Sequence, residues 1–354
     1  MSSVREFLDL VARQADAVEK AEERMRARAG APMRRGFRQL VRDAATRWAL
    51  LSDAVQRGDT TAISVFTALF GSMRQYVPDL RRDTVTLLQL GVSQAHEADD
   101  MLTDDTEDDT DDTVDDEPED DDEIDDEDDD IEFDDVDDIP DDIEDIYLDI
   151  DDAVDDKIEQ ASAYFRADIS RGKGPDKNRL DTAVAIAGRS VNSVEVGASQ
   201  VAVRAVSEGQ RAVAKARGRR LIWTAERNAC LTCLAYSGVV SKPGGGFPGG
   251  LTFGDKPRTP KNAVVRPPAH PNCRCTTTVY NPADDPGLLI SASLKREAQR
   301  SVVKGWALES ESNAARRRAA ERLLAAGVDL PKSVVAEAQR KLRRKGRFVT
   351  TVPS

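Results

Sequence analysis

The sequence predicts a helix-rich α+β protein, and three observations lead to this fold class. Most of the chain has apolar residues at helical spacing, interrupted by glycine and proline. Only two short segments, 221–225 and 276–280, have the β-branched and aromatic residues typical of strands. These segments flank all four cysteines and one of the two histidines. We therefore expect a small antiparallel sheet with a Cys/His cluster at its edge, packed on a long helix at about 179–219.

The acidic residues are concentrated in one low-complexity tract. The 354-residue chain has a net charge of −15, but 37 of its 65 Asp and Glu residues lie between Asp99 and Asp156, where there is no Lys or Arg. Because like charges at this density repel, we expect a disordered linker over 99–156. The remainder has 50 basic and 28 acidic residues, which favours a polyanion such as DNA as partner. The tract would cover this basic surface before DNA arrives.

The composition divides the chain into four expected regions. These are an N-terminal helical region (1–98), the acidic linker (99–156), a domain with the sheet and the cluster (157–283) and a basic helical tail (284–354). Within the first region, Gly30-Ala31-Pro32 is expected to end one helix, and Thr60 or Thr61 to cap another. The apolar stripes of 37–55 and 191–205 are expected to offer docking faces. The N-terminus has no signal-peptide pattern, and the longest apolar-rich run, 62–73, is too short to span a bilayer.

The Cys/His cluster has the spacing of a metal site. Cys230 and Cys233 form Cys-x-x-Cys, and His270, Cys273 and Cys275 form His-x-x-Cys-x-Cys. Zinc takes four tetrahedral N or S ligands, presented in pairs by turns, and clustered cysteines in a cytosolic chain favour metal over disulfides. We expect one structural zinc on Cys230, Cys233 and Cys273, with His270 chosen over Cys275 as the fourth ligand. Two alternatives remain open: Cys275 in place of His270, and four reduced cysteines packed in a small core.

The closing motif of the cluster resembles that of a known family. The residues Pro-Pro-x-His-Pro-Asn-Cys-Arg-Cys at 267–275, after an aromatic-led strand and Cys-x-x-Cys, are similar to the phage head morphogenesis family, the minor capsid proteins of the Mu F type. The resemblance covers about 176–282. It implies a non-enzymatic structural protein of the virion head, associated with the portal protein or inner capsid proteins and near packaged DNA. It also implies assembly in the host cytoplasm, without a membrane partner, and is compatible with a homo-oligomer.

Two other functions fit parts of the sequence. A zinc-stabilised nucleic-acid-binding protein would use the basic ends of the long helix, 211–220, and of the tail, 340–347, on phosphate, although basic residues also suit a helix C-terminus or a soluble tail. A metal-dependent hydrolase would need an open coordination position and a general base. Glu226 is the only carboxylate close to the cluster in sequence, and His-Glu-x-x-His, phosphate-loop and Gly-x-Ser-x-Gly motifs are absent.

Overall fold

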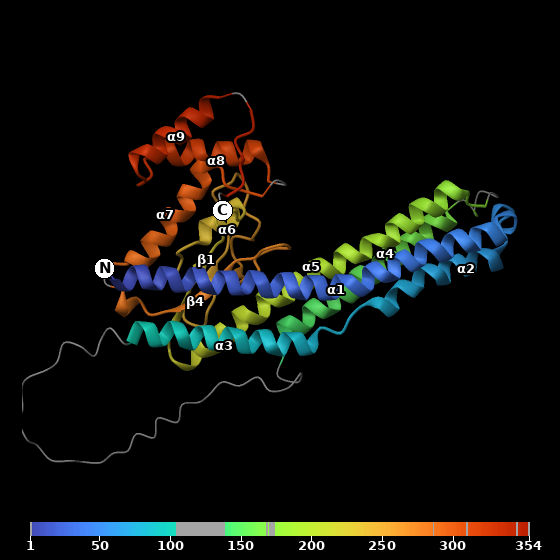
Figure 1. The fold of residues 1–354 in the computed structure, drawn as a ribbon, viewed down its shortest axis with the longest axis horizontal. Coiled ribbons are helices and arrows are strands. Elements are labelled where there is room, and N and C mark those ends of the chain that lie inside the picture. The colour runs from blue at the N-terminus through green and yellow to red at the C-terminus, as the bar shows by residue number, and fades with distance from the viewer. Residues whose placement is uncertain are drawn as a thin grey trace, which may run out of the picture. The chain divides into compact units, whose positions relative to one another are not determined.

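The computed structural model describes residues 2–103, 139–167, 169, 174–285, 287–308, 311–344 and 346–352. It confirms a mostly helical α+β protein with a small antiparallel sheet (Figure 1). The chain divides into two compact units. The bundle unit consists of Lys20–Val85 and Asp135–Ala202, and the sheet unit consists of Met1–Glu19, Thr86–Asp134 and Val203–Ser354. The sequence boundaries expected at residues 98, 156 and 283 therefore do not coincide with the limits of these units.

Three long helices contribute residues to both units. They are α1 (Ser2–Gln56), α3 (Arg81–Thr103) and α5 (Lys177–Ala216). The helix α1 runs through Pro32, so the expected stop at Gly30-Ala31-Pro32 is wrong. Ala29 and Met33, on either side of Gly30 and Pro32, are both fully buried. Packing on both sides of the proline keeps the segment helical although Pro32 cannot donate a backbone hydrogen bond.

The bundle unit also contains α2 (Thr60–Gly71), the 3₁₀ helix η1 (Ser72–Tyr76) and α4 (Asp141–Arg166). Its core is aromatic: the Phe165 ring lies 5.2 Å from that of Phe66 and 5.9 Å from that of Phe70. Asp59, rather than Thr60 or Thr61, caps α2, because its carboxylate accepts hydrogen bonds from the Thr61 and Ala62 amides.

The expectation of disorder over 99–156 is wrong at both ends of the tract. Residues 99–103 belong to α3 and residues 141–156 to α4, while 104–138 lie outside the described residues. Ile143, Ile150 and Val154 recur at helical spacing and are buried. Acidic residues in the first turn of α4 complement the helix dipole. Apolar burial therefore outweighs charge repulsion in this part of the tract.

The apolar stripes expected to dock a partner are largely buried inside the protein. On α5, Val194, Ala198, Val201 and Ala205 are all fully buried, and on α1, Leu40, Ala44 and Val55 are at most 3% exposed. The core therefore takes up the α5 stripe, whereas Val41 of the α1 stripe is 45% exposed, so docking through the α1 stripe stays a prediction. Over the described residues, no helix is both long and apolar enough to cross a membrane.

The sheet unit is built on two paired strands, β1 (Arg220–Thr224) and β4 (Thr276–Tyr280). They run antiparallel, with Ile222 opposite Thr278. The last turns of α5 pack on them, because Val213 shares a core with Trp223 and Val279. This confirms the expected sheet on a long helix. A second pair, β2 (Phe247–Pro248) and β3 (Val264–Val265), was not expected.

The basic end of α5 is neutralised within the sheet unit. Arg217 and Arg219 donate to the two carboxylate oxygens of the buried Asp99, at 2.9 and 2.7 Å. Arg211 pairs with Glu208, which is also buried. These contacts anchor the helix end to α3. They pair three of the basic residues of 211–220 that were considered for binding phosphate.

The C-terminal residues are part of the sheet unit. Beyond the 3₁₀ helix η5 (Pro282–Asp284), they form α7 (Leu289–Lys304), α8 (Asn313–Ala325) and α9 (Lys332–Arg343). Val302 of α7, Ala320 of α8 and Phe348 share a core with Leu231 and Leu234 of α6 (Leu231–Tyr236). The expected separate tail beginning at residue 284 is therefore packed directly onto the segment that carries Cys230 and Cys233.

Candidate metal centre

The first two cysteines lie at the start of α6. A turn over 225–229 connects β1 to this helix, and Cys230 is its N-cap. The Sγ atom of Cys230 accepts a hydrogen bond from the Cys233 amide at 3.5 Å. Because an N-cap side chain points back toward the first helical turn, both sulfurs are directed to the same side of the helix start. The Cys-x-x-Cys spacing thus produces a pair of sulfurs here.

The other three candidates lie just before β4. The Cys273 amide donates to the His270 carbonyl at 3.0 Å, and this turn has Asn272 in the left-handed region at φ 61°. Asparagine tolerates that conformation better than most residues. The His270 Nδ1 atom lies 2.8 Å from the Pro271 carbonyl oxygen. Since a carbonyl only accepts, Nδ1 carries the proton, and the lone pair of neutral His270 is on Nε2.

The structure brings all five predicted residues together. His270 Nε2 lies 3.1 Å from the sulfurs of both Cys230 and Cys233, and Cys233 Sγ lies 3.5 Å from Cys273 Sγ. Ligands of a tetrahedral zinc are about 3.5–3.8 Å apart, given metal bonds of about 2.0–2.3 Å. The separations are thus near those of a shared metal shell, and the groups lie close enough to hold an ion.

Cys233 connects two overlapping groups of ligands. Cys230, Cys233 and His270 form one, and Cys233, Cys273 and Cys275 form the other, each with its ligand atoms within 4.8 Å of one another. The hydrogen-bond-length contacts link Cys230, Cys233, His270 and Cys273, which is the set preferred from the sequence. Cys275 is fully enclosed in the core beside them. The choice of four ligands among the five stays a prediction.

The electrostatics of the cluster divide its four thiols into two pairs. Contact with Cys230 raises the pKa of Cys233 well above its usual range, and for Cys275 contact with Cys233 lowers the pKa but contact with Cys273 and burial raise it by more. Contact with Cys233, followed by that with His270, lowers the pKa of Cys230 to about 4 despite burial. Contacts with Cys233 and Cys275 likewise hold the pKa of Cys273 well below its usual range. Burial lowers the pKa of His270, but Cys230 and the charge of Cys273 raise it by more. Thiolates are the metal-binding form of cysteine, and enclosed negative charge is stabilised by a metal ion.

A buried arginine supports the start of α6. The side chain of Arg316, on α8, is fully buried, and burial lowers its pKa to about 10. Its guanidinium donates to the Ala229 carbonyl at 3.1 Å, to Ser301 Oγ at 3.0 Å and to the Trp306 carbonyl. Arg316 therefore fixes the residue before Cys230. This role of Arg316 was not expected from the sequence, since a single arginine in an Ala/Arg-rich helix carries no distinguishing signal.

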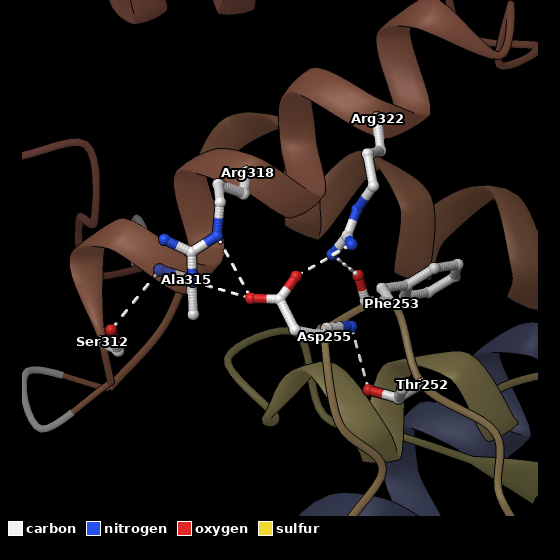
Figure 2. Close-up of polar contacts among 8 residues, drawn as sticks. Thr252, Phe253, Asp255, Ser312, Ala315, Arg318 and Arg322 are labelled. Carbon is white, nitrogen blue, oxygen red and sulfur yellow. Dashed lines mark hydrogen bonds and ion pairs between the residues drawn. The ribbon is translucent and has the colours of Figure 1, made fainter.

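The loop between Cys233 and His270 is tied down at both its core and its surface. Phe247 packs edge-on against Trp223 at 5.1 Å, and Tyr236 bonds Thr259 at 3.0 Å. On the surface, Asp255 accepts from Arg318 at 2.7 Å and from Arg322 at 2.9 Å. Figure 2 shows the carboxylate of Asp255 between these two α8 side chains. The loop thus joins the cluster to the C-terminal helices.

Glu226, the carboxylate considered as a general base, is engaged in an ion pair. Its Oε2 atom lies 3.1 Å from Arg274 Nη2, and Arg274 also contacts Glu19 at 3.2 Å. The arginine partner orients this carboxylate. His96, the other histidine, lies on α3 and is in neither ligand group found among the described residues. The side chains around the cluster thus serve mainly to position it.

Comparison of the chain with protein-family models, with curated proteins and with solved structures found no match. The features that indicate a function are therefore the chemistry of the cluster, the charges of the surface and the motif at 267–275.

Proposed function

We propose that this chain is a minor structural protein of a tailed-phage head, and that its Cys/His cluster holds one zinc ion as a structural centre. The observation that carries the proposal is the meeting of all five candidate ligands in the sheet unit, with Cys233, Cys273 and Cys275 buried and with Cys230 and His270 half-buried. The motif that resembles the head morphogenesis family supplies His270, Cys273 and Cys275, and these meet Cys230 and Cys233 beside the core. A donor set of thiols and one imidazole with its Nδ1 already bonded suits zinc.

The cluster fits a structural role better than a catalytic one. Five candidate ligands surround the site, and Cys233, Cys273 and Cys275 are each at most 2% exposed. A catalytic zinc needs one coordination position open to water or substrate. With four protein ligands the shell would be complete, and the metal would connect α6 to β4 across the loop. The hydrolase alternative has no supporting observation in the cluster.

The partners follow from the head assignment. The protein would associate with the portal or the inner capsid in the host cytoplasm, enter the head before DNA and then lie beside packaged DNA. The apolar stripe of α5 does not supply the portal contact, since it is buried, whereas the α1 stripe keeps Val41 45% exposed. The second candidate function, a zinc-stabilised nucleic-acid-binding protein outside heads, is favoured by the excess of 50 basic over 28 acidic residues outside 99–156.

Mass spectrometry of purified particles tests the proposal. We expect the protein in DNA-filled heads, and in the same amount in empty precursors, because it would enter before DNA. Its absence from both would contradict the head assignment and favour the second candidate. A portal protein co-expressed with the chain should copurify with it. Metal analysis of the purified chain tests the centre separately, with about one zinc per chain expected.

A further inference from the structure

One face of α1 in the bundle unit is a continuous basic stripe. Its members recur at intervals of three, four or seven residues, which places them on one side of a helix within an arc of about 80°. All six are exposed. We call them the α1 basic stripe: Lys20, Arg24, Arg28, Arg35, Arg38 and Arg42.

The stripe has no acidic residue within it. Between residues 17 and 49, the other positions on this side of α1 are alanines and one threonine, Thr46. Helices that are only solvated usually alternate charge signs along a face, because i,i+4 pairs of opposite charge stabilise them. A face with one sign of charge costs stability through repulsion. That cost implies a use for the concentrated charge.

Two arginines of α1 outside the stripe are held by a carboxylate of the bundle unit. Arg26 and Arg34, whose side chains are 47% and 46% exposed, share the carboxylate of Glu195, which lies 3.8 Å from Arg26. Within the stripe, Arg28 pairs with Asp83. Among the described residues, none of the other five stripe members is within ion-pair distance of a carboxylate: Lys20, Arg24, Arg35, Arg38 and Arg42. The stripe therefore retains most of its charge for a partner.

We propose that the α1 basic stripe binds the phosphate backbone of duplex DNA. From Lys20 to Arg42 the helix rises about 33 Å, which is close to one turn of the B-form duplex at about 34–36 Å. Arginine binds phosphate with a planar, two-pronged donor set. A protein interface of this length would need apolar anchors at its centre, and this face offers only alanine. Contacts to phosphate alone carry no base specificity, as suits packaged DNA of any sequence.

This inference deepens the proposed function, since it rests on DNA being a partner, but its test requires no phage particle. The full-length chain is titrated with a fluorescent duplex of random sequence at several salt concentrations. The test variant carries Arg24→Gln, Arg35→Gln, Arg38→Gln and Arg42→Gln. Glutamine has a helix propensity close to that of arginine, so α1 is retained. The control variant removes the same charge from exposed residues of the sheet unit that lie outside 211–220 and 340–347: Lys256→Gln, Lys261→Gln, Lys295→Gln and Lys332→Gln.

Each phosphate contact contributes about 0.9 to the slope of log K against log salt for duplex DNA. We expect the stripe variant to lower the slope by roughly 3 to 4, and to weaken binding about tenfold per lost contact at 0.1 M salt. The control variant should change the slope by less than about 1. An unchanged slope in the stripe variant, or equal losses in both variants, would overturn the proposal.

Polyglutamate serves as the competing ligand. If the wild-type chain binds polyglutamate as tightly as duplex DNA and the stripe variant loses both equally, the stripe recognises acidic polypeptide rather than nucleic acid, and the DNA assignment is wrong. Preferential loss of DNA binding supports it. The head assignment is judged independently by the content of purified particles.

Discussion

The bundle unit and the sheet unit bury their interiors with different chemistry. In the bundle unit, Phe66, Phe70 and Phe165 form an apolar core on continuous helices. In the sheet unit, the strands β1 and β4 have five residues each, and the core beside them includes thiols, an imidazole and a buried guanidinium. Helices with long apolar stripes are stabilised by burial alone, whereas a short sheet with a long loop needs cross-links. The bundle unit has a buried polar contact of its own, from Ser199 Oγ to Glu22 at 2.6 Å, but a metal cross-link should matter only in the sheet unit.

The largest expected effect is that of metal removal. Zinc binding contributes roughly 10–16 kcal/mol in small zinc domains, and that energy is folding energy. Chelation, or Cys230→Ser together with Cys273→Ser, should release the metal and unfold the turns at 225–233 and 267–275. Hydrogen exchange resolved along the chain should rise sharply there and in α6, but not in α2 or α4.

Two results would contradict this expectation. One is a metal-free wild-type chain with the same protection in α6, which would indicate four reduced cysteines in an ordinary core. The other is equal deprotection of α2, which would mean that the bundle unit also depends on the metal. A Cys275→Ser variant separates the ligand sets, because it should keep the metal if His270 is the fourth ligand.

The second expected effect is the loss of an apolar core residue in the bundle unit, which should leave the metal centre intact. Phe165 is fully buried between Phe66 and Phe70, so Phe165→Ala should cost about 3–5 kcal/mol of unfolding free energy. The loss should appear as faster exchange in α2 and α4, with the zinc content unchanged. Tyr164→Ala, which changes the neighbouring exposed ring, is the matched control. Equal losses in both variants would show that core packing is not the cause.

The sequence predicted the strands and the Cys/His cluster of the sheet unit, but not the contacts that hold them in place. The β-branched and aromatic residues at 221–225 and 276–280 form the expected sheet, and the Cys/His spacing identified residues that do meet. Both signals are local: they depend on residue type and spacing within one motif. Arg316 could not be found this way, because its acceptors, Ala229 and Trp306, offer backbone carbonyls that carry no sequence signature.

The errors in the helices have a common physical cause. Proline disfavours a helix at residue 32, and repulsion between carboxylates disfavours one over 141–156. In both places the burial of apolar residues stabilises the helix by more than these effects destabilise it: Met33 in the first, and Ile143 and Val154 in the second. Ile143, Ile150 and Val154 were visible in the sequence at intervals of seven and four. Their helical period was a better guide than the net charge of the tract.

A third effect should follow from removal of the buried guanidinium. Arg316→Met keeps much of the side-chain volume but leaves the Ala229 and Trp306 carbonyls without this donor. Each unsatisfied buried polar group costs about 1–3 kcal/mol. Because the Trp306 carbonyl keeps the Ser301 hydroxyl as a donor at 3.3 Å, a loss of about 1–3 kcal/mol is expected. Zinc affinity should fall as well, because Ala229 precedes Cys230. Arg340→Met on the exposed side of α9 is the control, and an equal change in that variant would remove the special role of Arg316.

The smallest effect concerns the surface contact of the Cys233–His270 loop. Arg318, followed by Arg322, lowers the pKa of Asp255 below its usual range. A carboxylate with a depressed folded pKa contributes stability that is present above its unfolded pKa, about 4, and is lost as pH falls through the folded value. Because both arginines are exposed, salt should screen most of this contribution.

A carbon NMR titration of the aspartate carboxyls resolves this contact. Asp255 should titrate below the usual aspartate range, because Arg318 and Arg322 favour its ionised form. Arg318→Gln should move the Asp255 midpoint up, and 1 M salt should do the same, since the screening length then falls to about 3 Å. At neutral pH, Asp255→Asn should speed hydrogen exchange at 253–258, and Asp329→Asn, which changes a carboxylate that is 92% exposed, should not. An Asp255 midpoint that neither Arg318→Gln nor salt moves would show that the arginines of α8 do not hold the loop in solution.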